Sequence, residues 1–211
     1  MPTKYKLIYF NFRARAECAR LLFAQAGVEY EDCRLTQDEF KAIKEDVTKV
    51  PLGQLPVLEI DEHPPLPQSH AIERYLAKKL GLYGKDDGET VRIDVACESI
   101  RDLVTYLMKI YFESDTTKKA ELEKSFIEKD SVTILTAMTR VLEKQSEQGK
   151  GYFIGDSMTL ADIAIFNFFD GLFKHMPPLI DKYPTLRAFE DKMRAEPKIA
   201  AWLAKRPETQ F

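Results

Sequence analysis

The sequence has little cysteine, and the cysteines it has are widely spaced. There are three of them, Cys18, Cys33 and Cys97. No two form a CxxC pair, and none belongs to a Cys/His cluster with the spacing of a zinc site. A sparse, odd number argues against a disulfide framework and suits a reducing compartment. The sequence therefore predicts neither dithiol redox chemistry nor a structural zinc site.

Long apolar runs and a strong charge of one sign are also missing. The most apolar stretch, 163–173, contains Asn167 and Asp170 and is shorter than the roughly 20 residues that span a bilayer. The first ten residues, MPTKYKLIYF, lack the basic region and long apolar stretch of a signal peptide. Because 31 Lys and Arg face 34 Asp and Glu, the net charge is only −3. We expect a cytoplasmic protein that binds neither nucleic acid nor membrane.

The chain does have the composition of a folded protein, with 45% hydrophobic residues. Its first 81 residues alternate strand and helix patterns. Strands are predicted at 4–10, 30–35, 56–60 and near Leu66, and helices at 16–26, 38–46 and 69–80. The order βαβαββα, with a βαβ start that favours parallel strands, predicts a thioredoxin-like α/β domain over residues 1–81.

The rest of the chain carries no strand pattern. Residues 82–88 form a Gly-rich, charged linker, and residues 89–211 are predicted to form an all-α domain of about five helices. These helices are expected at 89–113, 118–148, 159–173, 178–195 and 198–205. Thr159 and Asp162 have the spacing of a capping box, which we interpret as a folding signal for the apolar third helix.

Two motifs near the start of the chain could serve a site or could be structural. Tyr9 ends the first strand, and Arg13 and Arg15 follow it at a helix N-terminus, where cations are unfavourable. Taken alone, a tyrosine at this position is usually a buried structural residue. Pro56 opens a strand after Leu55, where a cis bond is possible, although an ordinary strand boundary is the commoner explanation.

A third motif, Gln68-Ser69, precedes a helix. Ser69 is a good N-cap, and the free N–H groups of a helix N-terminus can bind a carboxylate or a phosphate. In most proteins such a residue is only a cap. Each of the three motifs is therefore weak by itself.

In order and spacing, however, the motifs resemble those of the cytosolic glutathione S-transferases over essentially the whole chain. The resemblance rests on Tyr9 in YFNFRARAE, Leu55-Pro56, Gln68-Ser69 and TLAD at 159–162. The segments KLIYFNFRARAE and WLAKRPETQF are similar to the sigma class. That class includes haematopoietic prostaglandin D synthases and the S-crystallins of cephalopod lenses.

The resemblance implies that glutathione is the cosubstrate and that its thiol must become a thiolate. A free thiol has a pKa of ~8.5, so only a few per cent is ionised at neutral pH. The Tyr9 hydroxyl would donate a hydrogen bond to the sulfur. A charge-assisted bond of ~1.5–3 kcal/mol corresponds to a lowering of the thiol pKa by about one to two units. Arg15 would add positive potential.

The resemblance also implies two sets of binding residues. The glutathione site would contain Tyr9, Arg15, Phe40, Lys44, Gln54, Leu55, Pro56, Gln68 and Ser69, with Asp102 contributed by the partner subunit of a homodimer. Phe40 stands where sigma members commonly carry Trp, so an indole donor is absent. The pocket for small hydrophobic electrophiles would contain Phe12, Ala14, Val104, Met108, Tyr111 and Phe211.

Two departures from the family pattern carry further expectations. Arg101 interrupts the acidic cluster, Glu98 and Asp102 here, with which some prostaglandin D synthases bind a divalent metal, so we expect no metal. Ala14 occupies a position usually held by glycine and would narrow the mouth of the pocket.

Three functions remain open at this point. The first is a detoxifying transferase that conjugates glutathione to electrophiles, with isomerisation of prostaglandin H2 to D2 as a further candidate activity. The second is a non-catalytic lens crystallin of the same fold, and the third is a ligandin-type carrier. Many crystallins of this type carry an insertion after the helix at 89–113, so the short 114–118 connection favours the enzyme.

Overall fold

The computed structural model describes residues 2–176, 179 and 181–209. Its chain divides into two compact units, one formed by residues 1–82 with 196–211 and the other by residues 83–195. The C-terminal segment thus groups with the N-terminal sequence, whereas the sequence-based division placed all of 89–211 in a helical domain.

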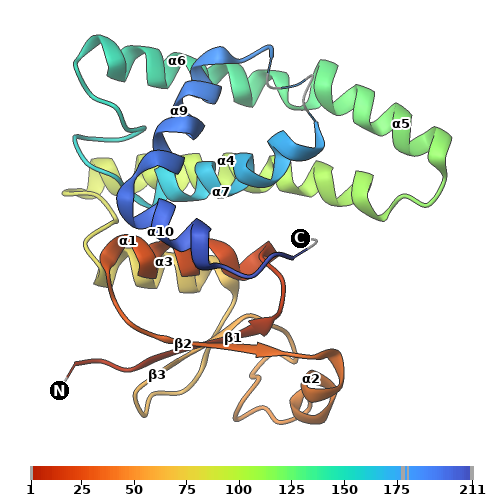
Figure 1. Ribbon diagram of the computed structural model, residues 1–211, viewed down its shortest axis with the longest axis vertical. Helices are drawn as coiled ribbons and strands as arrows, with labels where there is room; N and C mark the ends of the chain where they lie inside the picture. Colours follow the sequence, from red (N-terminus) through yellow and green to blue (C-terminus); the bar gives the residue numbers. More distant parts are fainter. Residues whose placement is uncertain (1, 177–178, 180, 210–211) are drawn as a thin grey trace. The chain divides into compact units, whose positions relative to one another are not determined.

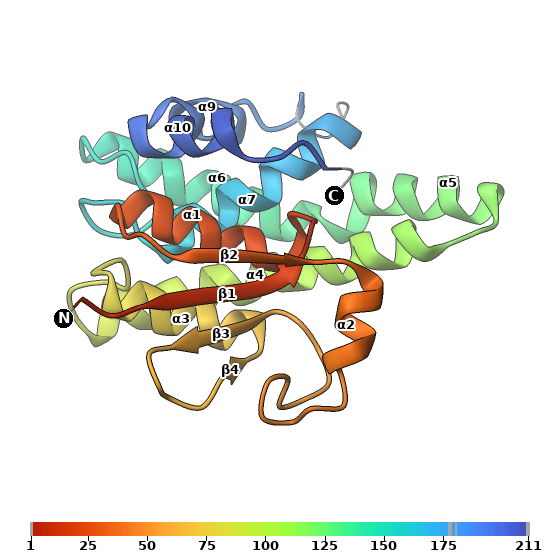
Figure 2. The ribbon, with the colours of Figure 1, turned by 60° about the horizontal axis from the view of Figure 1, so that its bottom comes forward.

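The first unit contains a four-stranded sheet with the order β2-β1-β3-β4 (Figure 2). The strands are β1 (Tyr5–Phe10), β2 (Glu31–Leu35), β3 (Val57–Ile60) and β4 (Leu66–Pro67). β1 and β2 are parallel, as a βαβ unit requires. The pairs β1–β3 and β3–β4 are antiparallel, so the predicted hairpin is also present.

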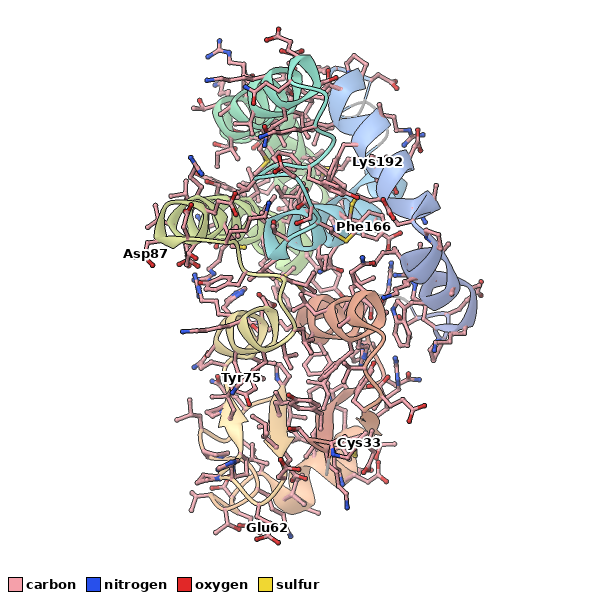
Figure 3. The ribbon with its side chains drawn as sticks, turned by 90° about the vertical axis from the view of Figure 1, so that its left-hand side faces the viewer. Cys33, Glu62, Tyr75, Asp87, Phe166 and Lys192 are labelled. Atoms are coloured by element: carbon pink, nitrogen blue, oxygen red, sulfur yellow. The ribbon has the colours of Figure 1, made fainter. Side chains whose placement is uncertain are left out.

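Helices α1 (Glu17–Ala26) and α3 (Ser69–Lys79) pack together on one face of this sheet, and α2 (Gln37–Ile43) lies away from them (Figure 1). α1 buries Leu21, Leu22 and Phe23 completely, which accounts for most of its contribution to the core. Tyr75, labelled in Figure 3, extends from α3 toward the strands and hydrogen bonds to Tyr5. The order βαβαββα is confirmed.

The last helix of this unit, α10 (Pro197–Lys205), packs against α1 although the two are far apart in sequence (Figures 1 and 2). Lys198 Nζ donates to the carbonyl of Gln25 at 2.9 Å. Trp202 Nε1 donates to Glu17 Oε1 at 2.9 Å. These contacts fix α10 along the length of α1.

The second unit is helical. Its described helices are α4 (Asp87–Phe112), α5 (Thr116–Ser125), α6 (Val132–Glu147), α7 (Leu160–His175) and α9 (Pro184–Ala195). The linker is shorter than predicted, because the Asp86 carboxylate accepts from the Glu89 N–H at 2.8 Å and so caps α4. No helix in the described ranges is long and apolar enough to cross a bilayer.

The prediction of one helix over 118–148 is wrong. A π-helical turn, Phe126–Asp130, separates α5 from α6. The hydroxyl of Ser131, which is fully buried, donates to the carbonyl of Phe126 at 2.7 Å and takes that oxygen out of the regular helical pattern. Phe126 is itself completely buried, so the turn is part of the core of this unit.

Asp162 organises the start of α7, as its position in a capping box predicted. Its Oδ2 accepts from the N–H and the hydroxyl of Thr159 at 2.8 and 2.9 Å, and its Oδ1 accepts from the Phe153 N–H at 2.8 Å. The carboxyl is fully buried, and burial raises its pKa to about 6 despite these bonds. Farther along α7, Asp170 pairs with Arg194 of α9.

Candidate functional site

One pocket in the first unit collects six of the residues predicted for the glutathione site. They come from the β1–α1 loop, the loop before β3 and the N-terminus of α3, which are distant in sequence. Its lining is Arg15, Leu52, Gln54, Leu55, Pro56, Pro67, Gln68 and Ser69. Sequence reasoning missed Leu52 and Pro67. Their only signal is their position in the chain, two residues before Gln54 and directly before Gln68.

The loop before β3 provides one wall of this pocket. The Leu55–Pro56 peptide bond is cis, and Pro56 is buried while Leu55 is half-buried. Earlier in the loop, Gly53 has a φ of 60°, and a Cβ placed there would lie 3.7 Å from the carbonyl oxygen of Lys44. Lys44 therefore lies directly beside the pocket wall, although it does not line the pocket.

The N-terminus of α3 contributes further lining residues. Ser69 is buried, and Gln68 adopts a φ of 75°, a region that residues other than glycine rarely occupy. The Gln68 side chain makes no capping bond, and the first turn of α3 contains no acidic residue. The N–H groups of this turn are therefore not neutralised locally, and the helix end attracts an anion.

Tyr9 lies near the end of β1 with only 7% of its surface exposed. Its hydroxyl accepts a hydrogen bond from the backbone N–H of Arg15, a pocket residue. Burial raises the pKa of Tyr9, and the Arg15 bond and the charges of Arg15 and Arg20 offset this only in part. The phenol is therefore protonated at neutral pH and has its proton available to donate.

The loop between β1 and α1 carries Arg15 and has an unusual backbone. Ala14 has a φ of 29°, which lies in the left-handed region that favours glycine. The completely buried Arg20 donates through Nη1 to the carbonyl of Phe12 at 2.7 Å and anchors the loop. Sequence reasoning missed Arg20, since arginines are mostly exposed.

The remaining predicted residues do not line this pocket. Phe40 on α2 packs edge-on against Phe10, with ring centroids 5.2 Å apart. Phe12 and Ala14 are exposed in the first unit. The others predicted on α4 are exposed in the second unit: Asp102, Val104, Met108 and Tyr111. Phe211 lies outside the described residues. The roles given to these residues stay predictions.

The residues that the sequence analysis considered for metal binding lie on α4. Arg101 pairs with Glu98 there, one turn away, instead of extending an acidic cluster. Within the described residues, no group of three His, Cys, Asp or Glu side chains could hold a metal ion.

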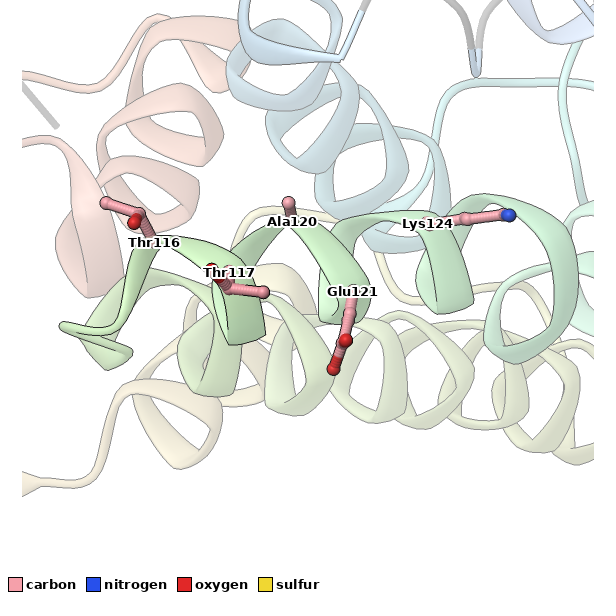
Figure 4. Close-up of a pocket in the computed structure, with 5 residues that line it drawn as sticks. All are labelled: Thr116, Thr117, Ala120, Glu121 and Lys124. Carbon is pink, nitrogen blue, oxygen red and sulfur yellow. The ribbon is translucent and has the colours of Figure 1, made fainter.

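A larger depression lies on the second unit but is a poor candidate. It has a volume of about 490 Å³, and Figure 4 shows that all its lining residues, Thr116, Thr117, Ala120, Glu121 and Lys124, belong to α5. It is open to solvent and brings no polar groups together from different elements. The pocket in the first unit has the convergent polar groups expected of a binding site, and Tyr9, which does not line it, is linked to it through Arg15.

Comparison with protein families assigns both parts of the chain. The family described as "Glutathione S-transferase, N-terminal domain" matches residues 5–78, and that described as "Glutathione S-transferase, C-terminal domain" matches residues 101–206. The chain belongs to the glutathione S-transferase family. A thioredoxin-like unit followed by helices is the fold of this family.

Individual relatives match over nearly the full length. The chain is 40% identical to S-crystallin SL11 of Nototodarus sloanii over 211 residues, which covers 100% of both chains. It is 39% identical to hematopoietic prostaglandin D synthase of Gallus gallus, with 99% of each covered. Among solved structures, a Nu-class glutathione S-transferase from Haemonchus contortus matches with a TM-score of 0.89 and 37% identity over 100% of both chains.

Proposed function

We propose that this protein is a cytoplasmic glutathione transferase of the sigma class, and that Tyr9 activates the glutathione thiol. The observation that carries the proposal is the protonated, buried Tyr9 hydroxyl, bonded to the Arg15 N–H beside the pocket. A phenol that already accepts one hydrogen bond is polarised, and it donates more strongly to a sulfur anion.

The pocket offers a complementary group for each polar part of glutathione. The backbone of Leu55 would pair with the cysteinyl backbone, as an added strand does. The γ-glutamyl carboxylate would bind at Gln68 and Ser69, where the α3 N-terminus carries no neutralising acid. Lys44, which lies beside Gly53, would meet the glycyl carboxylate.

The glutamyl ammonium group needs an anion, and we assign it to Asp102 of the partner subunit in a homodimer. Asp102 is exposed on α4, so its carboxylate is accessible to another chain. Phe40 packs on Phe10 and offers no N–H donor, so the glycyl end is held by fewer bonds than in members with Trp at this position.

In the reaction, the thiol loses its proton to solvent and the Tyr9 hydroxyl hydrogen bonds to the thiolate. The sulfur then attacks the electrophile with its lone pair, and a bond from the electrophilic carbon to its leaving group breaks. Phe12, Ala14, Val104, Met108, Tyr111 and Phe211 remain the residues that the family resemblance predicts for binding the electrophile. The similarity to a prostaglandin D synthase makes prostaglandin H2 a substrate to test.

A non-catalytic crystallin is the second candidate, and the 40% identity to S-crystallin SL11 supports it. The short 114–118 connection does not separate the two functions, because SL11 aligns over 211 residues with all of both chains. Because lens crystallins of this type often keep the tyrosine, Tyr9 does not separate the two functions either, and turnover of an electrophile is what would favour the enzyme.

The test is conjugation of glutathione to 1-chloro-2,4-dinitrobenzene, with prostaglandin H2 assayed in parallel. The enzyme should form product, and Tyr9→Phe should turn over more slowly at neutral pH. Binding of glutathione without turnover of any electrophile would favour the crystallin or a ligandin-type carrier.

A further inference from the structure

A chain of buried charges connects the C-terminal segment to the loop that supports Tyr9. Glu17 and Arg20, both on α1, are 1% and 0% exposed. Arg20 Nη1 lies 3.3 Å from Glu17 Oε2, and Arg20 Nε donates to Asp32 Oδ1 at 3.0 Å. Buried charges of this kind persist only when they are paired and hydrogen bonded.

Glu17 is held from its other side by two residues near the end of the chain. Its Oε1 accepts from Trp202 Nε1 at 2.9 Å and from Arg206 Nη1 at 3.1 Å. We refer to Trp202 and Arg206 as the C-terminal clamp. Both oxygens of the carboxylate are thus engaged, one with the clamp and one with Arg20, so its orientation is fixed.

Arg20 transmits this order to the β1–α1 loop. Its Nη1 donates to the carbonyl of Phe12 at 2.7 Å. On the strand side, Arg34 pairs with Asp32 at 2.8 Å and donates to Asn11 Oδ1 at 2.9 Å. The loop is therefore anchored at Asn11 and Phe12, immediately before the left-handed Ala14 and the Arg15 N–H that bonds to Tyr9.

We propose that Glu17 is a positioning residue for activation of the bound thiol. The C-terminal clamp orients Glu17, Glu17 orients Arg20, and Arg20 holds the loop so that the Arg15 N–H reaches the Tyr9 hydroxyl. This inference rests on the proposed function and adds that the C-terminal segment controls the strength of the tyrosine as a hydrogen-bond donor.

Two variants test the chain of contacts. Trp202→Phe removes the N–H donor and keeps an aromatic ring in the same place. Glu17→Gln keeps an oxygen that can accept from the C-terminal clamp. Its neutral amide, however, cannot compensate the positive charge of Arg20. Lys198→Met is the matched control, because it removes the α10–α1 bond to Gln25 at the far end of α1 from the loop.

The readout is the ultraviolet titration of the thiolate of bound glutathione, with glutathione affinity and the pH profile of kcat/KM measured beside it. In Trp202→Phe the thiol pKa should rise by about half a unit. For a bound thiol whose pKa lies about one to two units below ~8.5, this lowers the thiolate fraction, and with it kcat/KM, by about 1.5- to 2.6-fold at neutral pH. The loss should disappear at alkaline pH, and glutathione affinity should stay within about twofold of wild type. Glu17→Gln should shift the titration further, and Lys198→Met should not shift it.

A titration in folded Trp202→Phe that coincides with wild type and Lys198→Met would overturn the inference, even if Glu17→Gln fails to fold. Tyr9→Phe separates this failure from that of the proposed function. If Tyr9→Phe shifts the thiol pKa and Trp202→Phe does not, only the positioning role proposed for Glu17 is wrong. If wild type binds no glutathione, or if Tyr9→Phe leaves the thiol pKa unchanged, the proposed function is wrong. The positioning role of Glu17 is then wrong as well.

Discussion

Replacing Asp162 with alanine should destabilise the second unit strongly, because several buried donors depend on this carboxylate. Asp162→Ala leaves the N–H groups of Phe153 and Thr159 without an acceptor inside the core. Each stranded buried donor costs ~1–3 kcal/mol, and the Thr159 hydroxyl can turn to another acceptor. The free energy of unfolding should therefore fall by about 2–6 kcal/mol, minus the cost of burying the charge.

The stability difference between wild type and Asp162→Ala should also depend on pH. The folded pKa of about 6 lies above the ordinary Asp value of 3.8, so between these values the folded state binds more protons than the unfolded state. Stability contributed by this group is therefore complete below the unfolded pKa and is lost as the pH rises through 6. Wild type should gain about 2.4 kcal/mol over Asp162→Ala between pH 7 and pH 4.

Urea denaturation followed by circular dichroism at several pH values measures both effects. Thr159→Ser is the control, because it keeps the hydroxyl and the backbone N–H that bond to Asp162. At about pH 4, where most of the cost of burying the charge is absent, a loss below about 1 kcal/mol would refute the reasoning. A difference between wild type and variant that grows with rising pH would refute it as well.

Two further substitutions test the loop and the glycyl end of the site. Ala14→Gly should increase the free energy of unfolding by about 0.5–1 kcal/mol, because glycine adopts the φ of 29° without strain. The melting temperature should therefore rise modestly, and a lower melting temperature in a thermal scan would contradict this. Phe40→Trp should strengthen glutathione binding by about threefold through a new indole donor, and unchanged affinity in calorimetry would remove that position from the site.

The fold was predictable because its signals are local. Strand and helix patterns before residue 81 predicted the element order, and Gly27 marks the end of α1 with a φ of 71°. The break between α5 and α6 was not predictable in this way. No glycine or proline marks it, and it depends on the buried Ser131 hydroxyl reaching the Phe126 carbonyl.

The site was predictable as a set of residues but not as an arrangement of backbone groups. Family resemblance pointed to Tyr9, Leu55 and Ser69, whereas the Arg15 N–H on Tyr9 and the positive φ of Gln68 are properties of the folded backbone. The role proposed for Glu17 escaped sequence reasoning because two of its donors, Trp202 and Arg206, lie more than 180 residues away in the chain.

The most direct test of the account is the pKa of the glutathione thiol bound to wild type and to Tyr9→Phe, measured by ultraviolet titration of the thiolate. Wild type should hold the pKa about one to two units below the free value of ~8.5, and Tyr9→Phe should return it most of the way. Equal titration midpoints in the two proteins, with glutathione bound to both, would show that Tyr9 does not stabilise the sulfur anion.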